Sequence, residues 1–213
     1  MLFMKTINQK ISKNSIKTAL ILYNHALGWK ASYELLISFC KQYPDHNCIP
    51  IVQIKVSLIN KLFSTSLIAE RKWAKNIGNI QNLKTLLDKG NSLAVEKIAS
   101  CLNKDTFWVF ATKYCHFHNP KDFPIFDQYT EKALGYTYTD RTKPVSKWYN
   151  SYRLSVQGAI NSTEENYSFF QMDCFLWLKG QKMMIQKNDN KKNTLSREIQ
   201  FSMKEHQELW QQL

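Results

Sequence analysis

A lysine, a histidine and an aspartate lie close together in the stretch 107–134, and together they could act on a sugar carbon. Lys113 and His116 fall on one side of a predicted helix, with Val109 one turn before Lys113. The opposite stripe of that helix is apolar and is expected to face a core. Asp127 opens the next predicted helix after a short extended segment. An amine nucleophile near a carboxylate is a pair that such a reaction can use.

Each of these residues also has a purely structural interpretation. A lysine and a histidine opposite an apolar stripe are typical of a solvated helix face. Asp is among the preferred residues at a helix N-cap, because its carboxylate accepts the free amide N–H groups of the first turn. The residue types alone therefore favour Asp127 as a cap, and a catalytic role needs further support.

The composition is that of a chain with one sizeable core. Of its 213 residues, 44% are hydrophobic, and two small lobes are the alternative to a single domain. No apolar run reaches the roughly 18 residues that a membrane span requires. The first residues contain neither an apolar core nor a small-residue cleavage site. We therefore expect a cytoplasmic protein that does not cross a membrane.

The cysteine pattern argues against a zinc site. Five cysteines are scattered along the chain without any C-x-x-C spacing, which indicates reduced thiols. Cys115, His116 and His118 could ligate a metal, but no second group of ligands accompanies them. We expect neither a metal nor another cofactor.

The net charge of +12 favours an anionic partner, with DNA first. Basic and aromatic residues alternate between residues 136 and 152, as a surface that holds a nucleic-acid strand requires. Two alternatives remain: a coding bias, since nearly all basic residues are Lys, and a helical core with a solvated basic rim. The predicted DNA-binding residues are Lys104, Arg141, Lys143, Lys147, Trp148 and Arg153.

Apolar residues recur at helical spacing along the chain, and no segment shows convincing strand-like alternation bounded by hairpin turns. The sequence therefore predicts an all-α fold of about ten helices. The predicted parts are N-terminal helices (1–50) that pack with C-terminal helices, a helical core (51–180), a basic linker (181–193) after a stop at Gly180, and a last amphipathic helix (194–213). That last helix is expected to pack on its own chain or on a dimer mate rather than on a foreign partner protein.

Three segments resemble the helix–hairpin–helix DNA glycosylases, and more narrowly the small bacterial 8-oxoguanine-DNA-glycosylase-like family. They are 58–65, 110–118 together with 123–127, and 172–177. The second segment is the most specific, because the other two also read as ordinary core helices. The resemblance covers roughly residues 51–180 and implies a helical bundle of the glycosylase type with a degenerate hairpin.

In that superfamily an aspartate after a Pro-hydrophobic pair stabilises the cationic sugar, and in bifunctional members a lysine just after the hairpin attacks the anomeric carbon and forms a Schiff base. Asp127 matches the aspartate. Val109 stands in the place of the lysine, and the stretch 103–108 lacks both hairpin glycines. Lys113 lies one helical turn beyond Val109, where Cβ atoms are about 5–6 Å apart. Our hypothesis is that Lys113 is a relocated nucleophile, with Lys104 as the second candidate.

The resemblance implies a base-excision N-glycosylase that acts on a damaged or modified base, with an associated strand-nicking lyase activity, in DNA repair or antiphage defence. His116 would line the base pocket or assist proton transfer, and Val109, His118 and Gln128 would complete that pocket. The alternative is a catalytically degenerate module on the same fold that binds DNA, a modified nucleotide or a partner protein. A helical interaction protein that docks through its last helix is the third interpretation.

Overall fold

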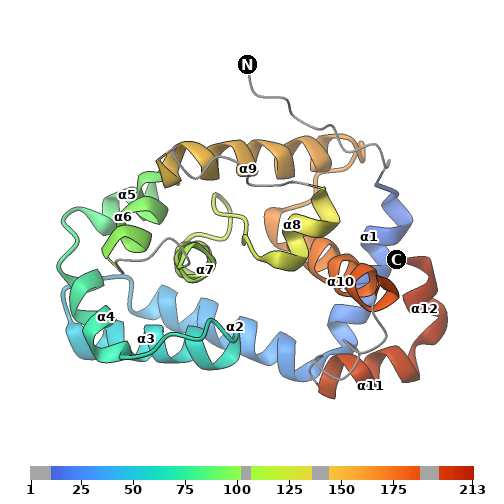
Figure 1. Cartoon of the computed structure of the whole chain (residues 1–213), viewed down its shortest axis with the longest axis horizontal. Helices are drawn as coiled ribbons and strands as arrows, with labels where there is room; N and C mark the ends of the chain where they lie inside the picture. The colour runs from blue at the N-terminus through green and yellow to red at the C-terminus, as the bar shows by residue number, and fades with distance from the viewer. Residues whose placement is uncertain (1–10, 102–106, 136–143, 188–196) are drawn as a thin grey trace. The chain divides into compact units, whose positions relative to one another are not determined.

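The computed structural model describes residues 11–101, 107–135, 144–187 and 197–213. Within these ranges all regular secondary structure is α-helical, as predicted. The helices, shown in Figure 1, are α1 (Lys13–His25), α2 (Leu27–Gln42), α3 (Ile49–Leu62), α4 (Glu70–Gly78), α5 (Leu83–Asp88), α6 (Leu93–Cys101), α7 (Trp108–His118), α8 (Gln128–Leu134), α9 (Val145–Asn161), α10 (Phe169–Lys187), α11 (Arg197–Glu205) and α12 (Gln207–Gln212). No helix among the described residues is both long enough and apolar enough to cross a membrane.

The chain divides into two compact units. Unit 1 comprises Met1–Ala31, Asp127–Thr139 and Leu154–Leu213, and unit 2 comprises Ser32–Phe126 and Asp140–Arg153. The boundaries between described residues therefore fall inside α2, inside α9 and between Phe126 and Asp127.

Within unit 1, α10 packs against both α1 and α8, and α12 packs on α1. The ring of Trp29 lies edge-on to Tyr23 at 4.9 Å and 4.4 Å from the ring of Trp177, so aromatic side chains join α1, α2 and α10. The hydroxyl of Ser15 donates to the carbonyl oxygen of Gln212 at 3.1 Å. The last helix of the chain is thus held against the first one.

Two helix boundaries in unit 1 differ from expectation. Helix α10 does not stop at Gly180 but continues to Lys187, so the first part of the expected linker 181–193 is helical, and its remainder lies outside the described residues. A Cβ atom at Gly180 would lie 2.1 Å from the carbonyl oxygen of Tyr129, so this glycine permits close packing of α8 on α10 instead of ending the helix. The expected helix 194–213 is divided at His206 into α11 and α12.

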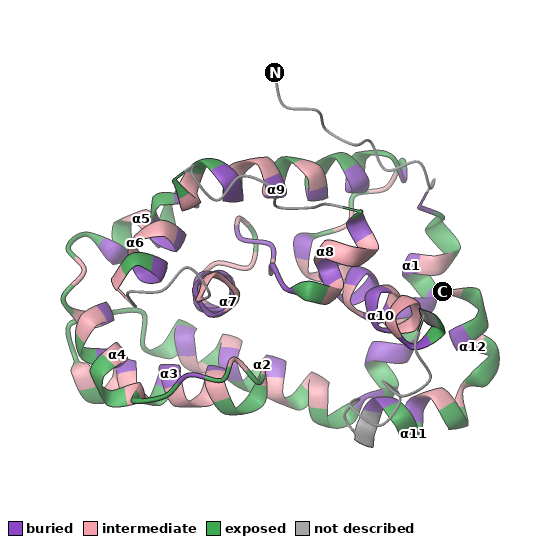
Figure 2. Ribbon diagram, in the orientation of Figure 1, coloured by how far each residue is buried: buried purple, intermediate pink, exposed green. Residues whose placement is uncertain are grey.

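Within unit 2, α3 buries Val52, Val56 and Ile59, which recur at helical spacing and therefore form one apolar stripe. Helix α7 packs against α3, α5 and α6. Figure 2 shows α7 buried over most of its circumference. Unit 2 is therefore built around the helix that carries the candidate lysine.

Candidate functional site

Helix α7 is buried from Phe110 to Phe117 without interruption. Only 7% of Lys113 is exposed, and His116 is fully buried. The interpretation of these two residues as a solvated helix face is therefore wrong. Buried polar side chains require hydrogen-bond partners, so the partners of each residue define what it can do.

The amine of Lys113 is held at the C-terminal end of α3. Its Nζ donates to the carbonyl oxygen of Phe63 at 3.0 Å and lies 5.8 Å from the centre of the Phe63 ring. Phe63 is the C-cap of α3, and the partial negative charge of a helix C-terminus attracts positively charged groups. This contact fixes the position of a lysine side chain that has four rotatable bonds.

The loop that follows Phe63 contains three non-glycine residues in the left-handed region, Ser64 (φ +48°), Ser66 (φ +57°) and Ala69 (φ +60°). Such conformations persist only where neighbouring contacts enforce them. Asn60 provides these contacts, because its side chain donates to the Leu67 carbonyl oxygen at 3.0 Å and accepts the Leu67 N–H at 2.8 Å. Helix α4 begins after this loop, at Glu70.

Both ring nitrogens of His116 are engaged in structural hydrogen bonds. Nδ1 lies 2.7 Å from the Phe123 carbonyl oxygen, which can only accept, so Nδ1 carries the proton. Nε2 therefore accepts from the hydroxyl of Tyr33 at 2.9 Å. Burial lowers the pKa of His116 to about 4 despite the Phe123 contact, so the ring is neutral at pH 7. His116 thus holds α2 and the 119–126 loop on α7, and these bonds leave it no free nitrogen for the expected proton transfer.

The extended segment 123–126 is tied by its backbone to α7 and α9. The hydroxyl of Thr112 accepts from the Phe126 N–H at 3.2 Å and lies 3.3 Å from the Phe126 carbonyl oxygen. The hydroxyls of two α9 tyrosines donate to the two carbonyl oxygens that precede Phe126. Tyr149 donates to Pro124 at 2.7 Å, and Tyr152 donates to Ile125 at 2.6 Å. The residue that precedes Asp127 is therefore fixed to the residue that precedes Lys113.

Asp127 is the N-cap of α8, as its residue type predicts. Its Oδ1 accepts the amide protons of Tyr129 and Thr130, each at 2.9 Å, and the Thr130 hydroxyl accepts the Asp127 N–H at 2.9 Å in return. This capping box orients the carboxylate, and 6% of the residue is exposed.

Lys113 belongs to unit 2 and Asp127 to unit 1. Of the other predicted pocket residues, Gln128 is exposed at the start of α8 and Val109 is half-buried on α7.

The predicted DNA-binding residues have different environments. Lys147 is exposed on α9. Trp148 is buried with 4% exposure and lies edge-on to Phe126 at 4.5 Å, so its expected place on a strand-binding surface is wrong. Arg153 donates to the carbonyl oxygen of Gly90 at 2.7 Å and to the side chain of Asn150, so its guanidinium links α9 to the residue that follows α5 and Lys89. Lys104, Arg141 and Lys143 lie outside the described residues.

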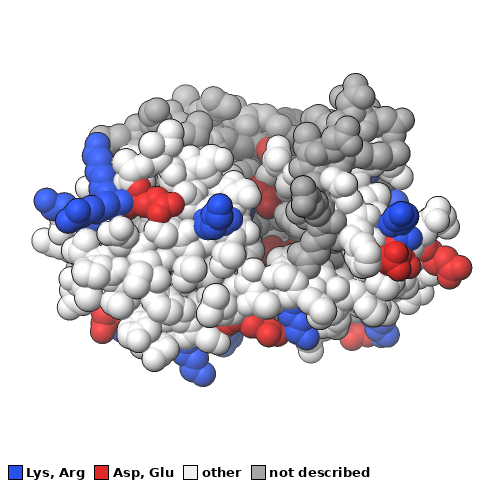
Figure 3. Space-filling view, turned by 90° about the horizontal axis from the view of Figure 1, so that it is seen from below, with Lys and Arg blue, Asp and Glu red and all other residues white. Residues whose placement is uncertain are grey.

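The described charges do not form a single basic face in the view of Figure 3. Lysine and arginine side chains lie there in separate groups, several of them beside acidic side chains. Opposite charges also pair within helices, as Lys84 and Asp88 do at 2.6 Å on α5. The excess of positive charge in the sequence therefore does not by itself locate a DNA-binding surface.

Three polar residues of unit 2 were not expected to matter. Lys55 is fully buried because it lies on the apolar stripe of α3, three residues after Val52. That spacing is the sequence feature that indicates its burial. Asn60 lies within a segment that resembles the glycosylases, but no pattern marked it as the organiser of a loop. His46 lies in the loop after α2, and the centre of its ring lies 4.6 Å from that of His118. Only the folded chain brings the two histidines together.

Comparison with known proteins identifies a family. A family model described as the HI_0787_N N-terminal domain matches residues 6–122, which is more than half of the chain. The chain is also similar to an uncharacterised protein of Haemophilus influenzae, with 30% identity over 144 residues that represent 65% of this chain and 71% of the relative. No solved structure shows a significant match to the chain. The matched region includes Lys113 and the Phe63 loop and ends before Asp127.

Proposed function

The chain belongs to the HI_0787_N family, and we propose that it is a DNA base-excision N-glycosylase that removes a damaged or modified base. One observation carries the proposal. The paired contacts between Thr112 and Phe126 join the direct chain neighbours of Lys113 and Asp127. An amine and a carboxylate are the two groups that departure of a base from a sugar requires, one to trap the sugar and one to stabilise its positive charge.

Lys113 has the properties of a positioned nucleophile. The residue is 7% exposed, and its amine donates to the carbonyl oxygen of Phe63, which precedes the loop that Asn60 holds in place. Desolvation is one of the ways by which proteins make a lysine reactive. The loss of side-chain freedom has already occurred in the free protein, so it does not add to the barrier of the reaction.

Asp127 has the properties of a preorganised carboxylate. Two amide N–H groups of α8 hold one of its oxygens, so it keeps its orientation without a substrate. A fixed negative charge stabilises positive charge that develops on a sugar ring as its base leaves. The cap and the catalytic role are compatible, because the cap uses Oδ1 alone among the described contacts.

In the proposed reaction the target nucleotide is first extruded from the duplex, at a cost of a few kcal/mol that binding offsets. The amine of Lys113, once it has given up its proton, forms a bond to C1′ as the N-glycosidic bond breaks. The electron pair of that bond leaves with the base, which takes up a proton. Loss of a proton from the amine and opening of the sugar ring, whose oxygen takes up a proton, produce a Schiff base between Nζ and C1′. Loss of a proton from C2′ then forms a C2′–C3′ double bond as the 3′ phosphate leaves, and the strand is nicked.

The proposal is tested with duplexes that carry a panel of damaged and phage-type modified bases, incubated with and without borohydride. Excision of one base and a borohydride-stabilised protein–DNA adduct are the expected results. Lys113→Gln should abolish the adduct, whereas Lys61→Gln, which changes an exposed lysine of α3, should leave it unchanged. Binding to every duplex without release of any base would contradict the proposal.

The alternative function is a binding module that has lost catalysis. The contact between Lys113 and the Phe63 carbonyl oxygen favours it, because a lysine that only caps a helix C-terminus makes the same bond. The DNA affinity of such a module should fall steeply as the salt concentration rises, and it should not change in the Asp127→Asn variant. The excision panel therefore separates the two functions.

A further inference from the structure

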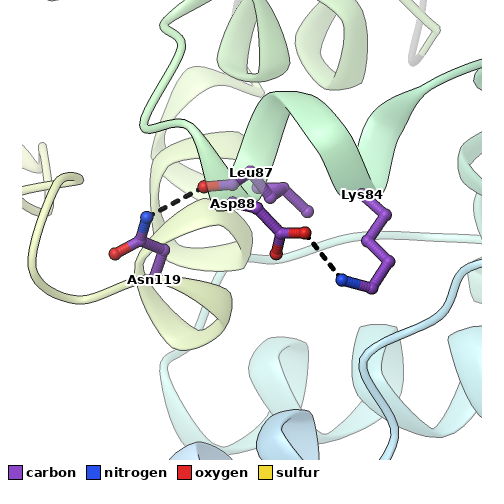
Figure 4. Close-up of polar contacts among 4 residues, drawn as sticks. All are labelled: Lys84, Leu87, Asp88 and Asn119. Carbon is purple, nitrogen blue, oxygen red and sulfur yellow. Dashed lines mark hydrogen bonds and ion pairs between the residues drawn. The ribbon is translucent and has the colours of Figure 1, made fainter.

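Unit 2 contains a cavity of about 360 Å³ to which neither Lys113 nor Asp127 contributes. Its walls come from α2, the loop after α2, α5 and the C-terminal end of α7. Asn119 fixes two of these walls to each other, because its side chain donates to the Leu87 carbonyl oxygen at 2.9 Å (Figure 4). The ion pair of Lys84 and Asp88 also lines the cavity. The volume is at the small end of the range of about 300–1,000 Å³ that small-molecule sites occupy.

Two histidines in the wall of this cavity leave a ring nitrogen unsatisfied. His46 and His118 both line it, and the Nε2 atom of each is buried without a hydrogen-bond partner among the described residues. A buried polar atom that lacks a partner costs about 1–3 kcal/mol. Native proteins contain few such atoms, and a ligand is one explanation for a pair of them in one cavity.

The contact of His46 with Tyr114 determines whether His46 presents a hydrogen-bond donor or an acceptor to the cavity. Its Nδ1 lies 2.9 Å from the hydroxyl of Tyr114, a fully buried residue. Among the described residues that hydroxyl has no other acceptor, so its proton is satisfied only by donation to Nδ1. The proton of the neutral ring therefore lies on Nε2, and His46 presents a hydrogen-bond donor.

A buried lysine stands next to this wall. Lys55 is fully buried, and its amine donates to the carbonyl oxygen of Asp45 at 3.0 Å without an ion pair among the described residues. Its pKa is lowered to about 8, mainly by burial, so it is largely charged at pH 7. Burial lowers the pKa of both His46 and His118, and the charge of Lys55 lowers it further. A buried positive charge without a partner is costly, and an anion nearby would offset that cost.

We propose that this cavity binds a small organic acid. Its carboxylate or phosphate group accepts a hydrogen bond from Nε2 of His46 and lies beside His118, in the field of Lys55. Its apolar body contacts Ile37 and Leu87, which line the same cavity. A metal ion fits this site less well, because the described residues contain no group of three histidine, cysteine or acidic side chains that could hold one.

The test uses the full chain, labelled with ¹⁵N at its five histidines, and follows their ring resonances at pH 7. The probes are benzoate, phenyl phosphate and the neutral isostere benzamide. The expected result is saturable movement of the His46 and His118 signals with an acid, and binding of benzamide that is roughly tenfold weaker or less. Saturation by benzoate alone assigns a carboxylate ligand, and saturation by phenyl phosphate alone assigns a phosphate monoester.

Variants separate charge from fold. Lys55→Met keeps the volume and removes the charge, so the variant should stay folded and lose the preference for the acid over benzamide. His46→Gln should weaken binding of the acid roughly tenfold or more. Lys75→Met, at an exposed position of α4, is the matched control and should change neither value. Any of four results would overturn the proposal, whatever the outcome of the excision panel. These are histidine signals that do not move, equal binding of benzamide and the acids, an acid preference that survives Lys55→Met, and a response to Zn²⁺ alone.

Discussion

The hydroxyl of Thr112 forms paired contacts with one residue of the following segment, the N–H and the carbonyl oxygen of Phe126. Thr112 and Phe126 are both buried in unit 2. In a sheet, a neighbouring strand would satisfy the backbone of such an extended segment, but here a helix side chain does so. This contact fixes the chain just before Asp127 and is the structural basis of the proposed function.

Thr112→Val should destabilise the protein by about 1–3 kcal/mol, because it retains the shape of the side chain and leaves the buried N–H of Phe126 without its acceptor. Urea unfolding monitored by circular dichroism measures the loss. Thr112→Ser keeps the hydroxyl and serves as the control, with a smaller effect. Equal stability of the Val variant and the wild type would show that these contacts contribute nothing.

Acid should destabilise unit 2 through His116. The pKa of His116 is lowered from 6.5 to about 4 in the folded protein, chiefly by burial, so the unfolded chain binds this proton more tightly. The contribution to stability is complete above pH 6.5 and is lost as the pH falls towards 4, by roughly 3 kcal/mol. The free energy of unfolding, measured between pH 7 and pH 4, should fall less steeply for His116→Gln than for the wild type. Parallel curves for the two proteins would refute this assignment.

Two variants of Asp127 separate its two roles. Asn caps a helix about as well as Asp, so Asp127→Asn should preserve stability and DNA affinity while it abolishes excision. Asp127→Ala also removes the cap, so it should in addition lower the free energy of unfolding by about 0.5–2 kcal/mol. Thermal unfolding and a single-turnover excision assay on the same samples provide both readings. Full excision by the Asn variant would leave Asp127 as a cap only.

The sequence predicted the helical class because that class follows from the spacing of apolar residues within each helix. It also predicted the Asp127 cap, which is a local property of residue type. It misplaced Trp148 because an alternation of basic and aromatic residues is the same for a DNA-binding surface and for a helix whose aromatic side faces the core. Spacing within a helix did not indicate that α7 is surrounded by its neighbours.

Other features could not be predicted because they depend on contacts between distant parts of the chain. Gly180 is a helix stop by residue type, and only the approach of Tyr129 explains why α10 continues through it. The pairing of His46 with His118 joins residues that are far apart in the sequence, and no local pattern encodes it. The same holds for the bond between Lys113 and Phe63.

Lys147 should contribute to DNA affinity as a phosphate contact, since it is exposed on α9. Lys147→Gln should weaken binding to all duplexes about equally and reduce the slope of log K against log salt by about 1. Fluorescence anisotropy at several salt concentrations measures this slope. The control is Lys75→Gln, and an identical loss for both variants would mean that only net charge matters.

The most direct test of the central claim is borohydride trapping with the Lys113→Gln variant and the wild type, on whichever duplex the wild type cleaves. The wild type should form a covalent adduct, and peptide mapping should place the sugar on Lys113. The variant should form none while it binds the same duplex within about twofold of the wild-type affinity. An adduct of equal yield in the variant, or one mapped to another lysine, would contradict the assignment of Lys113 as the nucleophile.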